Sequence, residues 1–215
     1  EVILNHKNRH QPAPNQQHDM FRDIDYIIAG LEPYDSDFFA NCPKLKCISR
    51  VGVGTDNINL AAAKAAGVRI CITSDQPSVA VAELCVGNII SLLRNTHEMS
   101  RLLKDGDWKP IQGIELRNCS VGIVGLGSIG KELAKRLSAF GCEIKSASRT
   151  WNSEFAASFG IQQLPLHQIF EKCNVVSVHL PLEKNTKGII SEELISSMMT
   201  GSILLNTSRA AIVDN

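Results

Sequence analysis

Three glycines, Gly125, Gly127 and Gly130, have the spacing G-x-G-x-x-G between a predicted strand and a predicted helix. Residues 121–124 form a short apolar run typical of a buried parallel strand, and apolar residues then recur at helical spacing as far as Phe140. In such a turn Gly125 permits the tight bend, Gly127 lets the backbone approach a pyrophosphate, and Gly130 lets helix and strand pack closely. The helix N-terminus then faces the negative charge. We predict a dinucleotide-binding site here; an ordinary tight turn is the alternative.

The residues that would face an adenosine ribose are Ser148, Arg149 and Thr150, which follow a predicted strand over residues 143–147. Pyridine-dinucleotide sites often carry Asp or Glu about 20 residues past the glycines, where the carboxylate binds the ribose hydroxyls. Here no carboxylate stands at that place, Arg149 can pair with a 2′-phosphate, and two hydroxyls can donate to it. The sequence therefore favours NADP over NAD as the cofactor, and a surface arginine in a loop is the alternative.

Two further segments could bind an anionic substrate. Arg209 comes soon after a predicted strand over residues 203–205, and in open parallel sheets ligands bind beyond the carboxyl ends of the strands. It could hold a charged substrate against the cofactor, or be an ordinary surface arginine. Residues 50–57, Arg-Val-Gly-Val-Gly-Thr-Asp-Asn, leave another predicted strand, and glycines in a turn can present successive backbone N–H groups to a carboxylate. On spacing alone, a plain strand-to-helix turn is the stronger interpretation of residues 50–57.

The histidines and cysteines predict no metal site. Residues 5–18 hold three histidines and two prolines without an apolar period, so we expect a solvated loop there. His179 lies near the end of a predicted strand over residues 175–180, where a structural or cofactor-lining role is expected. The seven cysteines are odd in number and include no C-x-x-C. They predict buried free thiols in a reducing compartment, the cytoplasm.

The elements that must position these residues form two α/β units with a boundary near residues 75–78. In the first unit, strands are predicted over residues 2–4, 26–29, 45–49 and 68–72, and helices over residues 36–41 and 60–66. In the second, besides the strands named above, helices are predicted to follow the glycines and to cover residues 154–159, 166–172 and 191–201. This alternation predicts an α/β fold, a Rossmann-type doubly wound parallel sheet with a smaller α/β unit.

One long helix is predicted to begin at Pro77, to run to about Leu103 and to stop near Gly106. A helix of that length with apolar residues over much of its surface must pack on something large. We expect it to lie between domains or subunits, with a helix packed on one sheet as the alternative. Its predicted apolar face comprises Val81, Leu84, Cys85, Ile89, Leu92 and Leu93.

The bulk composition excludes several classes of partner. Lys plus Arg and Asp plus Glu both number 22, so the formal charge is zero and gives no general attraction to nucleic acid or to acidic membranes. No apolar run reaches the ~18 residues that a membrane-spanning helix needs. The first residues do not resemble a signal peptide, because polar residues follow at once. The partner that we expect is a small molecule.

Six segments of the chain together resemble the D-isomer-specific 2-hydroxyacid dehydrogenases, especially the 3-phosphoglycerate dehydrogenase-like branch. They occur in the family's order and cover nearly the whole chain, namely residues 43–46, 50–58, 81–83, 124–130, 179–182 and 205–210. The resemblance implies a partial substrate domain over residues 1–75, of flavodoxin-like fold, and a partial dinucleotide-binding domain over residues 76–215. It implies an active site in the cleft between them and a homodimer built around the helix after Pro77.

The resemblance also implies roles for individual residues. Arg209 matches the arginine of a catalytic Arg-Glu-His set and would hold the substrate carboxylate and keto oxygen. The loop formed by Val51, Gly52, Val53 and Gly54 matches one whose N–H groups bind that carboxylate. Cofactor-contacting positions are matched by Gly125, Gly127, Ser128, Ile129, Gly130, His179, Leu180, Pro181, Thr207 and Ser208, and Ser148 takes the place of the ribose-binding Asp. No metal is implied.

Two departures from the family pattern bear on function. The ribose-binding Asp is replaced, which bears on cofactor choice, and the family's Glu and His are expected only beyond Asn215. We therefore expect a fragment, inactive by itself, of an NAD(P)-dependent oxidoreductase. The expected substrate is a 2-hydroxy or 2-keto acid such as phosphoglycerate, hydroxypyruvate or glyoxylate. The alternatives are a non-catalytic dinucleotide-binding scaffold of the corepressor kind and a different hydride donor, such as formate or phosphite.

Overall fold

The computed structural model describes residues 21–73 and 76–214, and the predictions for residues 2–4 and 5–18 lie outside the described residues. The chain divides into two compact units, Glu1–Gln76 and Pro77–Asn215. Each unit is described by itself.

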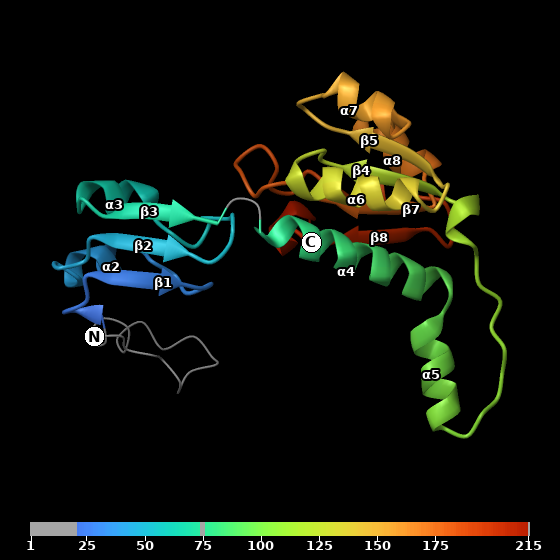
Figure 1. The fold of residues 1–215 in the computed structure, drawn as a ribbon, viewed down its shortest axis with the longest axis horizontal. Helices are drawn as coiled ribbons and strands as arrows, with labels where there is room; N and C mark the ends of the chain where they lie inside the picture. Colours follow the sequence, from blue (N-terminus) through green and yellow to red (C-terminus); the bar gives the residue numbers. More distant parts are fainter. Residues whose placement is uncertain (1–20, 74–75, 215) are drawn as a thin grey trace. The chain divides into compact units, whose positions relative to one another are not determined.

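Residues 21–73 of the first unit form a three-stranded parallel sheet with two short helices, and these elements lie where the sequence predicted strands and helices (Figure 1). Strands β1 (Tyr26–Ala29), β2 (Cys47–Arg50) and β3 (Arg69–Ile72) lie in the order β1-β2-β3. Helices α2 (Ser36–Asn41) and α3 (Leu60–Ala65) begin at Asp35 and Asn59, whose side chains accept hydrogen bonds from N–H groups in the first turn. Phe38 and Ile48 are buried between the helices and the sheet.

The second unit is a five-stranded parallel sheet in the order β6-β5-β4-β7-β8. Its strands are β4 (Ser120–Val124), β5 (Glu143–Ala147), β6 (Ile161–Gln163), β7 (Val175–Val178) and β8 (Ile203–Asn206). The predicted doubly wound parallel sheet is confirmed, with β4 at its centre and fully buried. The edge strand β6, three residues long, was not predicted.

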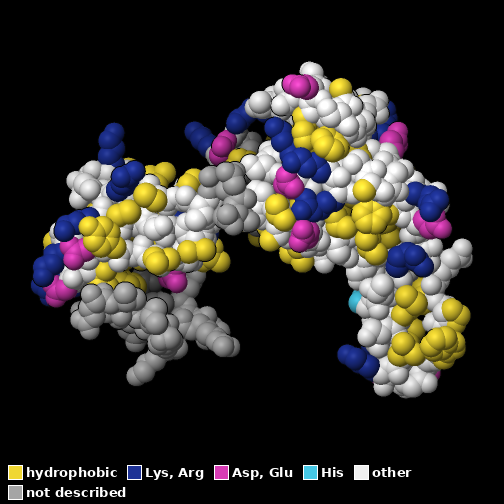
Figure 2. Space-filling model, viewed as in Figure 1, with side chains coloured by type: hydrophobic (Ala, Val, Ile, Leu, Met, Phe, Trp, Pro, Cys, Tyr) yellow, Lys and Arg dark blue, Asp and Glu magenta, His cyan; other side chains and the backbone are white. Residues whose placement is uncertain are grey.

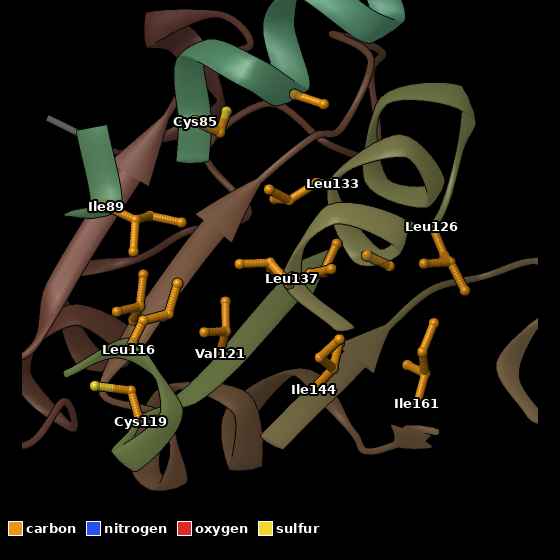
Figure 3. Close-up of a cluster of buried hydrophobic side chains, with 14 of the residues drawn as sticks. Cys85, Ile89, Leu116, Cys119, Val121, Leu126, Leu133, Leu137, Ile144 and Ile161 are labelled. Atoms are coloured by element: carbon orange, nitrogen blue, oxygen red, sulfur yellow. The ribbon is translucent and has the colours of Figure 1, made fainter. Parts of the chain in front are cut away.

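Helices cover both faces of this sheet. On one face α6 (Ser128–Ser138) packs on β4 and β5, and α4 (Gln76–Leu93) lies beside β8 (Figure 1). Cys85, Ile89, Val121 and Leu137 belong to one buried cluster on this face (Figure 3). On that face α7 (Ser153–Ser158) also joins the core. The other face is covered by α8 (Leu166–Lys172), α9 (Glu192–Ser196) and the 3-10 turn η2 (Ala210–Ile212). A second 3-10 turn, η1 (Leu116–Asn118), precedes β4. Phe140 lies beyond the end of α6 and is exposed, contrary to its predicted place on the helix.

The prediction of one long helix after Pro77 was wrong, because the chain breaks into α4 and α5 (Thr96–Lys104), which are bent by 62°. Asn95 has φ 53°, a left-handed conformation that no α-helix continues through. The predicted apolar face was also partly wrong. The buried stripe is Ala82, Cys85, Ile89 and Leu93, which repeat every three or four residues, whereas Leu84 is 57% exposed and Leu92 40% exposed.

Apolar side chains gather on the surface over α5 and the segment that follows it (Figure 2). Leu103, Trp108 and Ile114 are the exposed large apolar residues of this stretch. In the described ranges no single helix has the length and apolar composition to cross a membrane; α4 from Pro77 and α5 meet that test only as a bent pair.

Candidate functional site

A cavity of about 1060 Å³ opens in the second unit where the strands β4, β5 and β7 end. Nine of the residues predicted to contact a cofactor line it: Gly125, Gly127, Ser128, Ser148, Arg149, Thr150, His179, Leu180 and Pro181. The remaining predicted residues of this unit do not line it. Ile129 and Gly130 lie in the first turn of α6, and Thr207, Ser208 and Arg209 follow β8.

The three glycines have different surroundings. Gly125 has φ +97°, and a Cβ there would lie 2.6 Å from the carbonyl oxygen of His179. A Cβ at Gly130 would collide with the carbonyl oxygen of Gly125, so the start of α6 lies too close to the turn after β4 for any residue other than glycine. A Cβ at Gly127 would meet nothing within 4 Å, and Gly127 caps α6 without a side-chain hydrogen bond. The backbone at the start of α6 is thus open to a ligand, and this geometry fits a pyrophosphate.

At the end of β5, Ser148 is engaged by the protein itself. Its Oγ accepts a hydrogen bond from the Leu126 N–H at 3.2 Å and donates to the Thr150 carbonyl oxygen at 3.0 Å. Arg149 projects beside it, with Nη1 3.7 Å from Oε2 of Glu183. Glu183 lies in the loop after β7 and lines the same cavity. A carboxylate is therefore present near the end of β5, although it comes from the loop after a different strand, β7.

His179 is buried in a hydrogen-bonded row of side chains. Its Nε2 lies 2.9 Å from Ser177 Oγ and its Nδ1 lies 3.4 Å from Thr207 Oγ1. Thr207 Oγ1 in turn lies 3.5 Å from the Cys85 sulfur on α4. Burial lowers the pKa of His179 to about 4, so the ring is neutral at pH 7. It offers the cavity a polar but uncharged wall.

Arg209 stands on a turn fixed by its neighbours. Asn206 Nδ2 donates to the Arg209 carbonyl oxygen at 2.9 Å, and Ser208 Oγ donates to the Val178 carbonyl oxygen at 3.0 Å. The Arg209 guanidinium is partly buried and its Nη1 lies 3.5 Å from the Ser208 carbonyl oxygen. Because β7 and β8 pair with Val178 opposite Asn206, Arg209 follows at the same edge of the sheet as His179.

In the first unit, the loop from Val51 to Gly54 has two of its N–H groups already occupied. Val51 N–H donates to the Ala29 carbonyl oxygen at 2.9 Å, and Gly52 N–H donates to Thr73 Oγ1 at 2.7 Å. Gly52 has φ +135°, which favours glycine. Within the described ranges, the N–H groups of Val53 and Gly54 make no hydrogen bond, so these two remain as candidate donors.

Three residues of interest were not predicted from sequence. Arg50 is only 7% exposed, donates to the Val51 carbonyl oxygen, and has no partner for Nε in the part of the chain that the structure describes. Glu183 and Lys131 line the cavity, and Lys131 Nζ lies 5.4 Å from the centre of the Phe155 ring. Arg50 begins the matched segment 50–58, which was the one available signal; nothing local marks the other two.

No metal centre is formed by the described side chains, since none of their His, Cys, Asp and Glu groups cluster in threes. All seven cysteines are free thiols, four of them buried.

Comparison with known proteins identifies the chain's relatives. Residues 86–215 match the family described as D-isomer specific 2-hydroxyacid dehydrogenase, NAD binding domain. A D-3-phosphoglycerate dehydrogenase of Rattus norvegicus is 36% identical over 190 residues, which is 87% of this chain and 36% of that protein. A glyoxylate reductase of Thermococcus litoralis is 32% identical over 203 residues, 90% of this chain and 61% of that protein. The chain thus spans only about a third of the rat protein.

Solved structures agree with the sequence comparison. A 3-phosphoglycerate dehydrogenase of Entamoeba histolytica with bound NAD+ has a TM-score of 0.80 and 30% identity, and the match covers 94% of this chain and 62% of that one. The matched family covers the whole sheet and the glycine turn of the second unit. The chain therefore belongs to the D-isomer specific 2-hydroxyacid dehydrogenase family.

Proposed function

We propose that the protein interconverts a D-2-hydroxy acid and its 2-keto acid with an NAD(P) cofactor. The observation that carries this proposal is the cavity at the ends of β4, β5 and β7, where Gly127 leaves the start of α6 open to a diphosphate. The names of the relatives, phosphoglycerate dehydrogenase and glyoxylate reductase, indicate the class of acid. Phosphoglycerate, hydroxypyruvate and glyoxylate are the substrates to test.

The chain's own residues have separable tasks in this proposal. The cofactor would accept or supply the hydride, and the α6 N-terminus with Gly125, Gly127 and Ser128 would hold its diphosphate. Arg209 would bind the substrate carboxylate and polarise the keto oxygen through its fork of N–H donors. In the first unit, the N–H groups of Val53 and Gly54 and the buried Arg50 would add donors for an anion. Neutral, buried His179 is not assigned the proton transfer.

For the cofactor, we propose NADP over NAD. Arg149 lines the cavity with its side chain 75% exposed, and the hydroxyl-bearing Ser148 and Thr150 flank it. A 2′-phosphate would find there the Arg149 cation and the Thr150 hydroxyl as donors, since the Ser148 hydroxyl already donates to the Thr150 carbonyl oxygen. No carboxylate of β5 itself is available for the ribose hydroxyls. The NAD+-bound relative shows that NAD is used elsewhere in the family, so preference must be measured.

We also propose a cytoplasmic homodimer. The homodimer is supported by the large apolar residues that are exposed on α4, on α5 and in the segment up to η1, because such residues often mark contact surfaces: Leu84, Leu92, Leu103, Trp108 and Ile114. Light scattering coupled to size exclusion should give twice the chain mass, and Leu103→Glu with Trp108→Glu should return it to one. A monomer at high micromolar concentration would contradict this.

The main test separates binding from turnover. Titration with NADPH should give a saturable complex, and Gly127→Ala should abolish it without unfolding the protein. Turnover of the three acids is then measured on the polypeptide at its native length. There, Arg209→Gln should lower kcat/KM about a hundredfold or more, because a charge-assisted pair of hydrogen bonds to the carboxylate is lost. Coenzyme binding without turnover of any acid would favour the scaffold alternative, and absence of binding would refute both.

A further inference from the structure

Arg149 and Glu183 reach the same cavity from the two strands that flank β4. Arg149 comes from the end of β5 and Glu183 from the loop after β7, and their charged atoms are 3.7 Å apart. Asn185 lies against both. In the amide orientation that satisfies its neighbours, its nitrogen is 3.1 Å from Glu183 Oε2 and its oxygen 3.3 Å from Arg149 Nη1. The three polar groups therefore form one network at the place proposed for the adenosine ribose.

Hydrogen bonds fix the main chain of Glu183, from which the carboxylate side chain extends. Glu183 N–H donates to Thr186 Oγ1 at 2.8 Å, and its carbonyl oxygen accepts from the N–H groups of Thr186 and Lys187 at 3.1 and 3.0 Å. Thr186 is itself buried and also donates to the Pro181 carbonyl oxygen. Because these hydrogen bonds hold the backbone of the turn in place, we expect the carboxylate to move away from Arg149 only by rotation of the Glu183 side chain.

A guanidinium can bind a carboxylate or a phosphate in a bidentate manner, through two parallel N–H···O hydrogen bonds. It offers one favourable pair of donors for this, so the two kinds of anion compete for it. A 2′-phosphate carries about two negative charges at neutral pH, so it competes with Glu183 for Arg149 and is repelled by that carboxylate. Ribose hydroxyls carry no charge and can donate to a carboxylate, so NAD meets neither obstacle. We propose that Glu183 is a cofactor-specificity residue that lowers the preference for NADP by holding Arg149. The proposal rests on the proposed coenzyme function of this cavity.

The decisive variant is Glu183→Gln, which keeps the size of the side chain and removes its charge. Its matched control is Glu171→Gln, since Glu171 is an exposed carboxylate on α8 that does not line the cavity. Dissociation constants for NADP+ and NAD+ are measured by calorimetry at low and at physiological salt. Glu183→Gln should shift the ratio of the two constants about fivefold toward NADP+, equivalent to about 1 kcal/mol. Glu171→Gln should leave the ratio unchanged, and added salt should shrink the Glu183 effect.

A second background tests whether Glu183 acts through Arg149. In Arg149→Gln, which should itself weaken NADP+ selectively, the added Glu183→Gln change should shift the ratio by much less than fivefold. If Glu183→Gln shifts the ratio equally in the unaltered protein and in Arg149→Gln, Glu183 does not act by competing for Arg149. If Glu183→Gln alone leaves the ratio unchanged, Glu183 has no role in cofactor specificity. Both failures leave coenzyme binding intact. If the unaltered protein binds neither dinucleotide, the proposed function fails as well, so the two failures are distinguishable.

Discussion

Acidification from pH 7 to pH 4.5 should destabilise the Pro77–Asn215 unit, and the side chain of His179 should contribute a part of this loss that can be measured separately. Burial lowers its pKa to about 4, against 6.5 for an exposed imidazole. Between those pH values the unfolded chain binds a proton that the folded chain does not, so the free energy of unfolding falls as the pH falls. A difference of roughly two and a half pKa units corresponds to about 3 kcal/mol, nearly all of it lost by pH 4.

The assay is urea unfolding at intervals from pH 7.5 to 4.5, followed by tryptophan fluorescence. Both tryptophans, Trp108 and Trp151, lie in this unit, so the signal reports on it alone. His179→Gln retains a polar side chain for Ser177 and Thr207 but cannot titrate, so its unfolding free energy should decline far less over that range. The pKa of Glu132 is lowered by its ion pairs with Lys135 and Arg136, so protonation of such carboxylates also lowers the free energy of unfolding as the pH falls. This loss should be equal in the unaltered protein and in His179→Gln. Equal pH slopes for the two proteins would refute the reasoning.

Three other predictions concern the glycine turn, the helix break and the thiols. Gly130→Ala should lower the melting temperature by several degrees, because the added methyl group meets the Gly125 carbonyl oxygen. Gly127→Ala should keep the normal melting temperature and lose only coenzyme affinity. A lower melting temperature for Gly127→Ala than for Gly130→Ala in calorimetry would contradict the geometry. Asn95→Ala should cost about 1 kcal/mol in urea unfolding, because alanine tolerates φ 53° poorly, and Asn95→Gly should be nearly neutral; equal losses would argue against a left-handed residue there. In the native protein at most the three partly buried thiols should react with Ellman's reagent. The four buried thiols should react only after unfolding, and immediate reaction of all seven would contradict their burial: Cys42, Cys85, Cys119 and Cys173.

Most strands and helices could be predicted because each carries its own local signal. Runs such as residues 121–124 are apolar throughout since both sheet faces are covered, and helix starts such as Asn59 carry a capping side chain. Where the local signal was weak, the prediction failed. Strand β6 buries only Ile161 of its three residues, and the left-handed Asn95 looks in sequence like any polar helix residue.

The same distinction holds for the site. The glycine turn is contiguous in sequence, so its spacing, together with the predicted strand before it and the predicted helix after it, indicated its geometry. Glu183 and Arg149 are brought together only because β5 and β7 both flank β4, and strand order is a property of the whole sheet. The sequence-based prediction that no carboxylate is present to repel a 2′-phosphate is correct for the end of β5 but wrong for the cavity, which Glu183 also lines. The buried state of Arg50 likewise depends on packing of the loop that follows it.

Each strand pairing among the described residues is parallel, and this has a consequence for how the protein reaches its native state. Parallel neighbours cannot be joined by a tight hairpin, so each ladder forms only after a long crossover has closed. The hydrogen bond from Ser120 N–H to Asn174 Oδ1, for example, spans 54 residues. Pairings between such distant segments form slowly and leave apolar central strands unprotected in the meantime. Renaturation yield should therefore drop steeply with protein concentration, and slow production at low temperature should favour recovery of native molecules.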